Sequence, residues 1–230
     1  MVGVGPGLGA ALVRRFAKGG HAVAMIARSR DFIDGLAAEV VAAGGRTLAV
    51  TADVGDADQI ARAFDTVRSK LGAPELLLYN AGSGNRGTIT EITPEQYESS
   101  WRTNAYGAFL CAKQSVSDMI AKRRGVMLFT GATAGIKAGP KSAAFGPAKF
   151  AVRGLAQSLA RDLGPRGIHV AYVNVDGIID IPHIRTRMPS LQDEDLLKPD
   201  AIAESFWHLA NQDPSAWTQE LDVRPFKEKF

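Results

Sequence analysis

Four glycines stand at positions 3, 5, 7 and 9, between a short apolar piece and a helical pattern that begins at Leu8. Without β-carbons, these positions let the backbone turn tightly and approach a pyrophosphate. The helix that follows would present free N–H groups and the positive end of its dipole to phosphate oxygens. The pattern predicts a nucleotide-binding loop in which Gly3, Gly7, Leu8 and Gly9 contact the phosphates. Adenosylmethionine-dependent methyltransferases use similar loops, so the glycines alone leave that alternative open.

The next strand-like run, 21–27, ends without a carboxylate. Dinucleotide-binding folds that prefer NAD place an Asp or Glu about 20 residues after the glycine loop, where it holds the ribose 2′-hydroxyl. Here residues 27–30 read Ala-Arg-Ser-Arg, and the guanidinium fork of Arg28 can pair with a 2′-phosphate. We therefore predict that Arg28 and Ser29 favour NADP over NAD. The alternative is a solvated arginine at the entry of a helix.

The elements that must position these residues alternate between strand and helix. Apolar runs without polar alternation predict buried parallel strands at 21–27, 47–52, 75–79, 126–130, 168–174 and 220–223. Apolar residues at helical spacing, with glycine or proline stops, predict helices at 8–18, 31–43, 56–71, 94–121, 143–163 and 200–210. This order indicates an α/β fold with a single doubly wound, Rossmann-like parallel sheet of about seven strands and helices on both faces.

The length of 230 residues fits a single NAD(P)-binding domain over 1–230. Only Met1 and Val2 precede the first glycine, so the first strand is expected either to be clipped or to need residues that this chain lacks. The least regular stretch, 176–199, contains three prolines and leaves the carboxyl end of the sixth strand, where ligands bind in such sheets. We predict that it is a substrate lid; a mobile surface loop is the alternative.

Six motifs in this order resemble the short-chain dehydrogenases/reductases over almost the whole chain. Besides the glycine loop, the matching segments are Asp53-Val54, the Asn80-Ala81-Gly82 that follows Tyr79, the Asn104 of an NAYG sequence, Lys149 of a YxxxK-like motif, and Gly177 of a Pro-Gly-like pair. The resemblance implies that Asp53 and Val54 frame the adenine and that Asn80, Ala81, Gly82 and Gly177 line the cofactor. It also implies that Lys149 holds the nicotinamide ribose and that Asn104 organises a proton-relay water. The alternatives are an exposed helix lysine and an asparagine that only satisfies backbone groups at a helix irregularity.

The resemblance fails at two catalytic positions. The family uses a tyrosine to pass a proton to the substrate carbonyl and a serine to hydrogen-bond the substrate oxygen. Here the tyrosine position is Phe145 and the serine position is Ala132, so both hydroxyls are absent. Loss of a general acid costs typically 10²–10⁴-fold in rate. His183 is the more reasonable substitute acid, with a solvent-exposed loop histidine as the alternative. Tyr79 and Tyr106 suit packing better, and the hydroxyls of Thr130 and Thr133 are poor acids at neutral pH. Asp176 and Asp180 are in a segment that could approach the nicotinamide end. In the family, a threonine near the position of Ile181 often hydrogen-bonds the nicotinamide carboxamide, and that contact is expected to be missing here.

These observations favour an NADP-dependent oxidoreductase that acts on a carbonyl, alcohol or enone with weakened catalysis. The alternative is a catalytically silent NADP-binding scaffold or redox sensor. The expected partners are a small-molecule substrate and, by family analogy, further copies of the chain in a homodimer or homotetramer.

Composition argues against several other classes of protein. The net charge of only +3, with mixed signs, gives no nucleic-acid footprint. A single cysteine, Cys111, and four scattered histidines predict no disulfide and no metal site. The chain has no apolar run of about 18 residues and no leader-like start, so we expect no membrane span and a cytoplasmic location.

Overall fold

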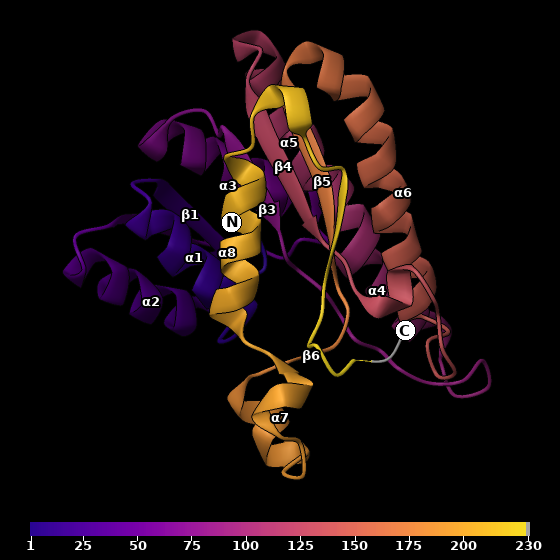
Figure 1. Ribbon diagram of the computed structural model, residues 1–230. Coiled ribbons are helices and arrows are strands. Elements are labelled where there is room, and N and C mark those ends of the chain that lie inside the picture. The colour runs from indigo at the N-terminus through magenta and orange to yellow at the C-terminus, as the bar shows by residue number, and fades with distance from the viewer. Residues whose placement is uncertain (229–230) are drawn as a thin grey trace.

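The computed structural model describes residues 1–228 and is built around one parallel β-sheet (Figure 1). Its strands are β1 (Ala22–Ala27), β2 (Arg46–Thr51), β3 (Leu76–Tyr79), β4 (Gly125–Thr130), β5 (Ile168–Val175) and β8 (Glu220–Val223). β2 pairs with β1, and β3, β4, β5 and β8 follow one another toward the other edge. Val2 pairs in parallel with Ile26 and with Tyr79, and so joins the two groups of strands into one sheet.

The chain therefore starts in the middle of the sheet, runs outward to β2, and returns to the other side of Val2. A crevice forms at such a reversal of strand order, outside the carboxyl ends of the strands. Six strands and the Val2 pairing give the seven positions expected, and the predicted fold class is confirmed. The first strand position is occupied by this bridge at Val2.

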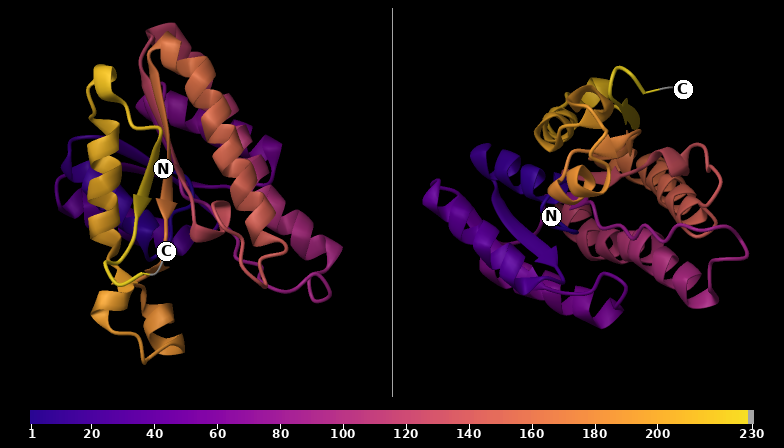
Figure 2. Two further views of the ribbon diagram at one scale, coloured as in Figure 1. Left: turned by 45° about the vertical axis from the view of Figure 1, so that its right-hand side comes forward. Right: turned by 90° about the horizontal axis from the view of Figure 1, so that it is seen from below.

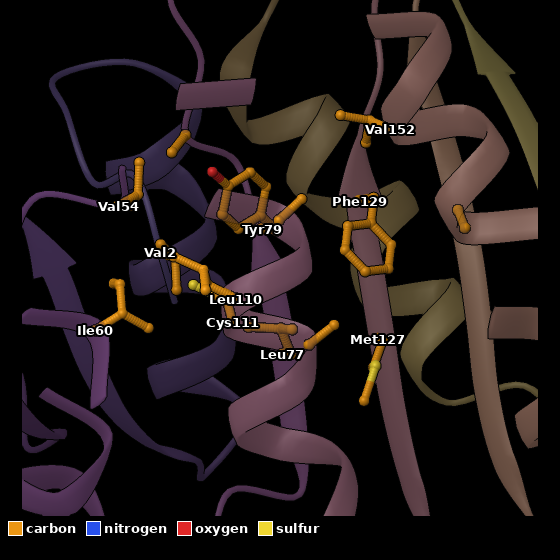
Figure 3. Packing of buried hydrophobic residues seen from close by; sticks show 14 of the residues in the cluster. Val2, Val54, Ile60, Leu77, Tyr79, Leu110, Cys111, Met127, Phe129 and Val152 are labelled. Atoms are coloured by element: carbon orange, nitrogen blue, oxygen red, sulfur yellow. The ribbon is translucent and has the colours of Figure 1, made fainter. Parts of the chain in front are cut away.

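Helices cover both faces of the sheet (Figure 2). One face carries α1 (Leu8–Lys18), α2 (Arg30–Ala42) and α8 (Pro199–Ala210); the other carries α3 (Ala57–Leu71), α5 (Gly107–Lys122) and α6 (Phe145–Leu163). Because side chains alternate along a strand, Leu78 packs with the first group while Leu77 and Tyr79 pack with the second. Figure 3 shows the second core around Tyr79 and Phe129, with Cys111 of α5 buried against it.

The long helix predicted over 94–121 is confirmed, but it is not α-helical throughout. The structure has α4 (Pro94–Trp101), a π-helical turn (Arg102–Tyr106) and then α5. The start of α4 is as predicted, since Pro94 is its first residue and the Thr93 hydroxyl accepts a hydrogen bond from the Gln96 amide. A π-helical turn widens the backbone by one residue, and such turns are frequent at functional sites.

The 176–199 segment is more ordered than its sequence suggests. It contains β6 (Ile178–Ile179), α7 (Pro182–Arg187), a 3₁₀ turn (Asp193–Asp195) and β7 (Leu196–Leu197), with β6 and β7 paired in parallel. It projects beyond the carboxyl end of β5 (Figure 1). Other 3₁₀ turns lie at Thr133–Gly135, Gly164–Arg166 and Pro214–Ala216. None of the helices in residues 1–228 combines the length and the apolar character needed to cross a membrane.

Candidate functional site

The glycine loop is packed too tightly for side chains at two of its positions. Gly3 has φ +82°, and a β-carbon there would lie 2.2 Å from the amide nitrogen of Ala81. A β-carbon at Gly9 would lie 2.8 Å from the Gly3 carbonyl oxygen. α1 begins at Leu8 with no side-chain cap from Gly7. The Ala10 amide donates to the Gly5 carbonyl at 3.0 Å, so the amides of Leu8 and Gly9 are those left for a ligand. The loop, with Gly82 and Asn80, borders a pocket of about 380 Å³.

Arg28, Ser29, Asp53 and Val54 line the same pocket, at the ends of β1 and β2. Arg28 is exposed and makes no ion pair with a carboxylate of residues 1–228, whereas its neighbour Arg30 pairs with Asp34. Ser29 precedes α2 without capping it. A cationic side chain and a free hydroxyl therefore stand together at a helix N-terminus, an arrangement that suits a phosphate.

Sequence reasoning missed Arg102 and Thr103, which line an adjoining pocket of about 340 Å³ together with Arg28 and Asp53. Arg102 donates to Glu98 at 2.7 Å and to the Gly55 carbonyl at 3.3 Å. Its position depends on the π-helical turn, and helical periodicity alone carries no signal for that turn.

Asn104, Gly82 and Lys149 converge at the other end of the glycine loop. A β-carbon at Gly82 would lie 3.3 Å from Asn104 Oδ1 and 3.6 Å from Lys149 Nζ. Asn104 Nδ2 donates to the carbonyls of Ser83 (3.1 Å) and Ser100 (2.8 Å). Its Oδ1 is buried and accepts no hydrogen bond from residues 1–228. An unused acceptor thus lies beside Gly82 and the Lys149 ammonium, where a water or a ligand hydroxyl can satisfy it.

Lys149 is almost fully buried on the first turns of α6, at 5% exposure. Its ammonium donates to the Thr130 carbonyl at 3.0 Å and has no carboxylate partner in the described chain. Burial therefore lowers the pKa of Lys149 to about 8. The Thr130 hydroxyl is also buried and without a partner among residues 1–228. Lys149 thus brings to this site a buried amine whose pKa is well below that of an exposed lysine.

Phe145 opens α6 one turn before Lys149, and its ring lies 5.7 Å from the Lys149 ammonium. The place that the motif gives to the family's tyrosine is thus occupied by an aromatic ring without a hydroxyl. Ala132 lies in the loop after β4, and its amide donates to the Tyr172 hydroxyl at 3.4 Å. Tyr172, which sequence reasoning missed, is fully buried beneath Gly131 and Gly135. Burial raises its pKa to about 12, so it positions this loop rather than supplying a proton.

The other proposed acids have different surroundings. Tyr79 is buried and donates to the Thr103 carbonyl, and burial raises its pKa well above the ordinary value. Tyr106 stacks between Trp101 and Phe109 at centroid distances of 5.6 and 6.4 Å. Both tyrosines have the packing role that was their alternative. His183 lies exposed on α7 and makes no hydrogen bond within the described chain. Asp180 is held in an ion pair with Arg185 at 2.7 Å, which lowers its pKa.

Asp176 and Thr133 belong to a polar network that sequence reasoning did not foresee. Thr133 Oγ1 donates to Asp176 Oδ1 at 2.6 Å, and Asp176 Oδ2 lies 3.3 Å from Arg224 Nη1. Arg224 also binds Asp222 at 2.8 Å, and Asp222 accepts a hydrogen bond from Asn174. The network connects the loop after β4 with the ends of β5 and β8, next to Ala132.

The 176–199 segment reaches the glycine loop through Ile181. A β-carbon at Gly7 would lie 2.6 Å from Ile181 Cγ2, so the isoleucine covers the start of α1. Gly177, with φ +149°, packs instead against Pro225 and Leu197. The structure thus brings Ile181, rather than Gly177, against the loop that would hold the phosphates.

These residues fit a dinucleotide. The cradle at Gly3 and Gly9 has no room for side chains, Arg28 and Ser29 suit a phosphate at one end, and Asn104 Oδ1 offers an unused buried acceptor at the other. Within residues 1–228, no group of three or more His, Cys, Asp or Glu side chains could hold a metal ion. A separate cavity of about 190 Å³ lies between the amino ends of β1 and β3, at the opposite edge of the sheet, and contains none of these residues.

Comparison with known proteins gives the same family from sequence and from structure. The family model described as short chain dehydrogenase matches residues 1–188. A 3-oxoacyl-[acyl-carrier-protein] reductase of Synechocystis sp. is 29% identical over 222 residues, which cover 94% of this chain and 89% of that protein.

Two solved structures are similar over almost their full lengths. A short-chain dehydrogenase from Rhodopseudomonas palustris is 33% identical, with a TM-score of 0.84 over 98% of this chain and 96% of that one. A metagenomic short-chain oxidoreductase in complex with NADP is 26% identical, with a TM-score of 0.85 over 97% of this chain and 94% of that one.

Proposed function

The chain belongs to the short-chain dehydrogenase family, and from that premise we propose that it is an NADP-dependent oxidoreductase with weakened catalysis, acting on a carbonyl, alcohol or enone. The observation that carries the proposal is the convergence of the buried Lys149 ammonium and the unused Asn104 Oδ1 at the end of the glycine loop. The name of the Synechocystis relative, a 3-oxoacyl reductase, supports carbonyl reduction as the reaction class.

In this proposal the chain holds NADP along the pocket beside the glycine loop. Gly3, Gly7, Leu8 and Gly9 face the pyrophosphate, and Asp53 and Val54 border the adenine. The 2′-phosphate pairs with Arg28 and Ser29, a preference supported by the missing carboxylate after β1. The backbone of Asn80, Ala81 and Gly82 and the ammonium of Lys149 hold the nicotinamide end. When bound, the reduced nicotinamide supplies a hydride.

The substrate oxygen must also gain a proton, and Phe145 has none to give. Lys149 is the remaining ionisable group at this position, and its pKa of about 8 makes it a usable acid at neutral pH. We assign the proton to Lys149 Nζ. It passes to the substrate oxygen through a water molecule that also donates a hydrogen bond to Asn104 Oδ1. Without the phenol and the serine hydroxyl, turnover is expected to be about 10²–10⁴-fold slower than with a complete set of catalytic groups.

The experiment is a titration with NADPH, NADH and adenosylmethionine by calorimetry, followed by NADPH oxidation with a panel of ketones, aldehydes and enones. We expect NADPH to bind at least about tenfold tighter than NADH, as an arginine–phosphate pair would give, and at least one carbonyl to be reduced above background. Tenfold tighter NADH binding would refute the cofactor preference. NADPH binding with no turnover across the panel would refute the oxidoreductase, and adenosylmethionine binding would revive the methyltransferase.

Phe145 and Ala132 favour one other candidate, a catalytically silent NADP-binding scaffold or redox sensor. The double variant Phe145→Tyr with Ala132→Ser separates the two. If the wild type is silent, restoring both hydroxyls should create reduction where none existed. If the wild type turns over slowly, the double variant should be faster, by up to about 10²–10⁴-fold. A double variant slower than an active wild type would mean that its chemistry depends on the phenylalanine.

Two finer features complete the proposal. The 176–199 segment acts as a lid, because Ile181 lies on the glycine loop that a bound cofactor would occupy. The chain assembles into a homodimer or homotetramer, supported by exposed aromatic side chains on α4, α5 and α6.

A further inference from the structure

Arg86 is held at a fixed place beside α6, although it lies in a loop. The amide of Gly87 donates to the Lys141 carbonyl at 2.9 Å, and the Ala143 amide donates back to the Gly87 carbonyl at 3.3 Å. On the other side, Asn85 Nδ2 donates to the Gln96 carbonyl at 2.9 Å. Both neighbours of Arg86 are therefore anchored, one to the segment before α6 and one to α4.

The side chain of Arg86 lies over Phe145. Its guanidinium carbon is 5.4 Å from the centroid of the ring, and the Lys149 ammonium is 5.7 Å from the same centroid. Arg86 is exposed, and no carboxylate within residues 1–228 forms an ion pair with it. The nearby Glu91 turns its carboxylate to the Thr88 amide at 2.8 Å. Since the ring is no conventional acceptor, the N–H donors of Arg86 remain available to a ligand.

The charges around Phe145 are one-sided. Residues 83–90 and 131–149, the latter running into the first turn of α6, contain Arg86, Lys137, Lys141 and Lys149 and no Asp or Glu. The next carboxylate along the chain, Glu91, is engaged by the Thr88 amide. In the 176–199 segment, most carboxylates already have a cationic partner: Asp180 and Asp193 pair with Arg185, Asp176 with Arg224, and Glu194 with Lys227. A site lined by uncompensated cations concentrates anions.

We propose that Arg86 binds a carboxylate of the substrate, so that the protein acts on oxo acids rather than on neutral ketones. The inference rests on the proposed function, because it places the substrate between Arg86 and Lys149. The planar guanidinium matches a carboxylate with two parallel hydrogen bonds, which orients the substrate as well as binding it. Phe145 then contributes an apolar surface for the carbon chain between the carboxylate and the carbonyl.

The test uses matched pairs of 2-, 3- and 4-oxo carboxylates and their methyl esters, with NADPH as reductant. In the wild type, kcat/KM for the preferred acid should exceed that for its ester by about 10- to 100-fold, the range of a charge-assisted hydrogen bond. Arg86→Gln should lower kcat/KM for the acid by a similar factor, mostly through KM, and leave the ester within about twofold. For the acid, Arg86→Lys should give a kcat/KM between those of the wild type and Arg86→Gln. Lysine keeps the positive charge but cannot form the two parallel hydrogen bonds of a guanidinium. The matched control is Arg46→Gln, an exposed arginine at the amino end of β2.

Calorimetry of the same acids and esters against the NADP-loaded protein separates this inference from the proposed function. If nothing is reduced but an acid binds more tightly than its ester, and Arg86→Gln removes the difference, the anion site stands and the oxidoreductase fails. If carbonyls are reduced but acids and esters are equal, or Arg86→Gln weakens both equally, the oxidoreductase stands and the inference is overturned. Equal loss in Arg46→Gln would also overturn it, since only overall charge would then matter.

Discussion

At the scale of single residues, burial of the Lys149 ammonium destabilises the folded state, and the rest of the fold must offset this free energy. Its ammonium is buried with one carbonyl partner and no counter-ion in the described chain, so the charged form is disfavoured. Such an arrangement makes little sense for stability alone, because a methionine would fill the same volume without desolvating a charge. It makes sense if the ammonium is completed by a ligand and gives up its proton during turnover.

This cost predicts a pH-dependent stability. In the unfolded chain the pKa of Lys149 is near 10.5, and in the folded chain it is about 8. Between these values the unfolded state binds more protons, so stability rises with pH across this window. The test is urea unfolding of the wild type and of Lys149→Met at pH 7.5 and pH 10.5. Relative to Lys149→Met, the wild type should gain about 3 kcal/mol in its free energy of unfolding between the lower and the higher pH.

Burial raises the pKa of Cys111 to about 12, so this thiol makes the folded state less stable as the pH rises. Both proteins contain Cys111, and subtracting one free energy of unfolding from the other removes this contribution. Lys113→Met, on an exposed lysine of α5, should show no such change. A Lys149 difference that is flat with pH would mean that the ammonium is solvated or paired in solution.

At the scale of elements, the Thr133–Asp176–Arg224 network holds together three segments that surround the candidate site. Asp176 is buried, and its two oxygens are used by the loop after β4 and by the segment after β8. Asp176→Asn keeps the shape but removes the charge opposite a largely buried guanidinium. We expect thermal or urea unfolding to show a loss of about 1–3 kcal/mol.

A matched control is the exposed pair of Asp162, in the last turn of α6, and Arg166, in the 3₁₀ turn that follows. Asp162→Asn should cost less than about 1 kcal/mol, since both side chains are about half exposed. Thr133→Val tests the other arm of the network, with an expected loss of about 0.5–1.5 kcal/mol for one neutral donor. Equal effects of Asp176→Asn and Asp162→Asn would show that the network has no special role.

Which elements could be predicted follows from how local their determinants are. The glycine loop is a short segment that its own spacing locates. Asn80 and the α6 pair of Phe145 and Lys149 also lie in short segments, and their resemblance to the family's motifs locates them. The π-helical turn at Asn104 could not be predicted, because apolar periodicity continues across it and the extra residue is held by side-chain contacts such as Asn104 to Ser100. The Asp176–Arg224 pair depends on the register of β5 against β8, and residues 48 positions apart give no local signal of it.

At the scale of the whole molecule, one surface exposes several large aromatic side chains to water. Trp101, Tyr106 and Phe109 form a stacked series from α4 into α5, and Phe150 lies on the neighbouring α6. Trp101, Phe109 and Phe150 are each 42–44% exposed, although large aromatic side chains gain most from burial. Clustered exposed aromatic residues are typical of protein–protein interfaces.

If this surface is the interface between copies of the chain, charge placed there should separate them. Light scattering after size exclusion should give a dimer or tetramer mass for the wild type, and Trp101→Glu with Phe109→Glu should shift the mass toward the monomer, because two carboxylates would be buried without partners. Val41→Glu, on the exposed side of α2 at 57% exposure, changes an apolar residue away from this surface and should leave the mass unchanged. A monomeric wild type, or a double variant with unchanged mass, would rule out this surface as the interface. Circular dichroism of the variants keeps a loss of assembly distinct from a loss of folding.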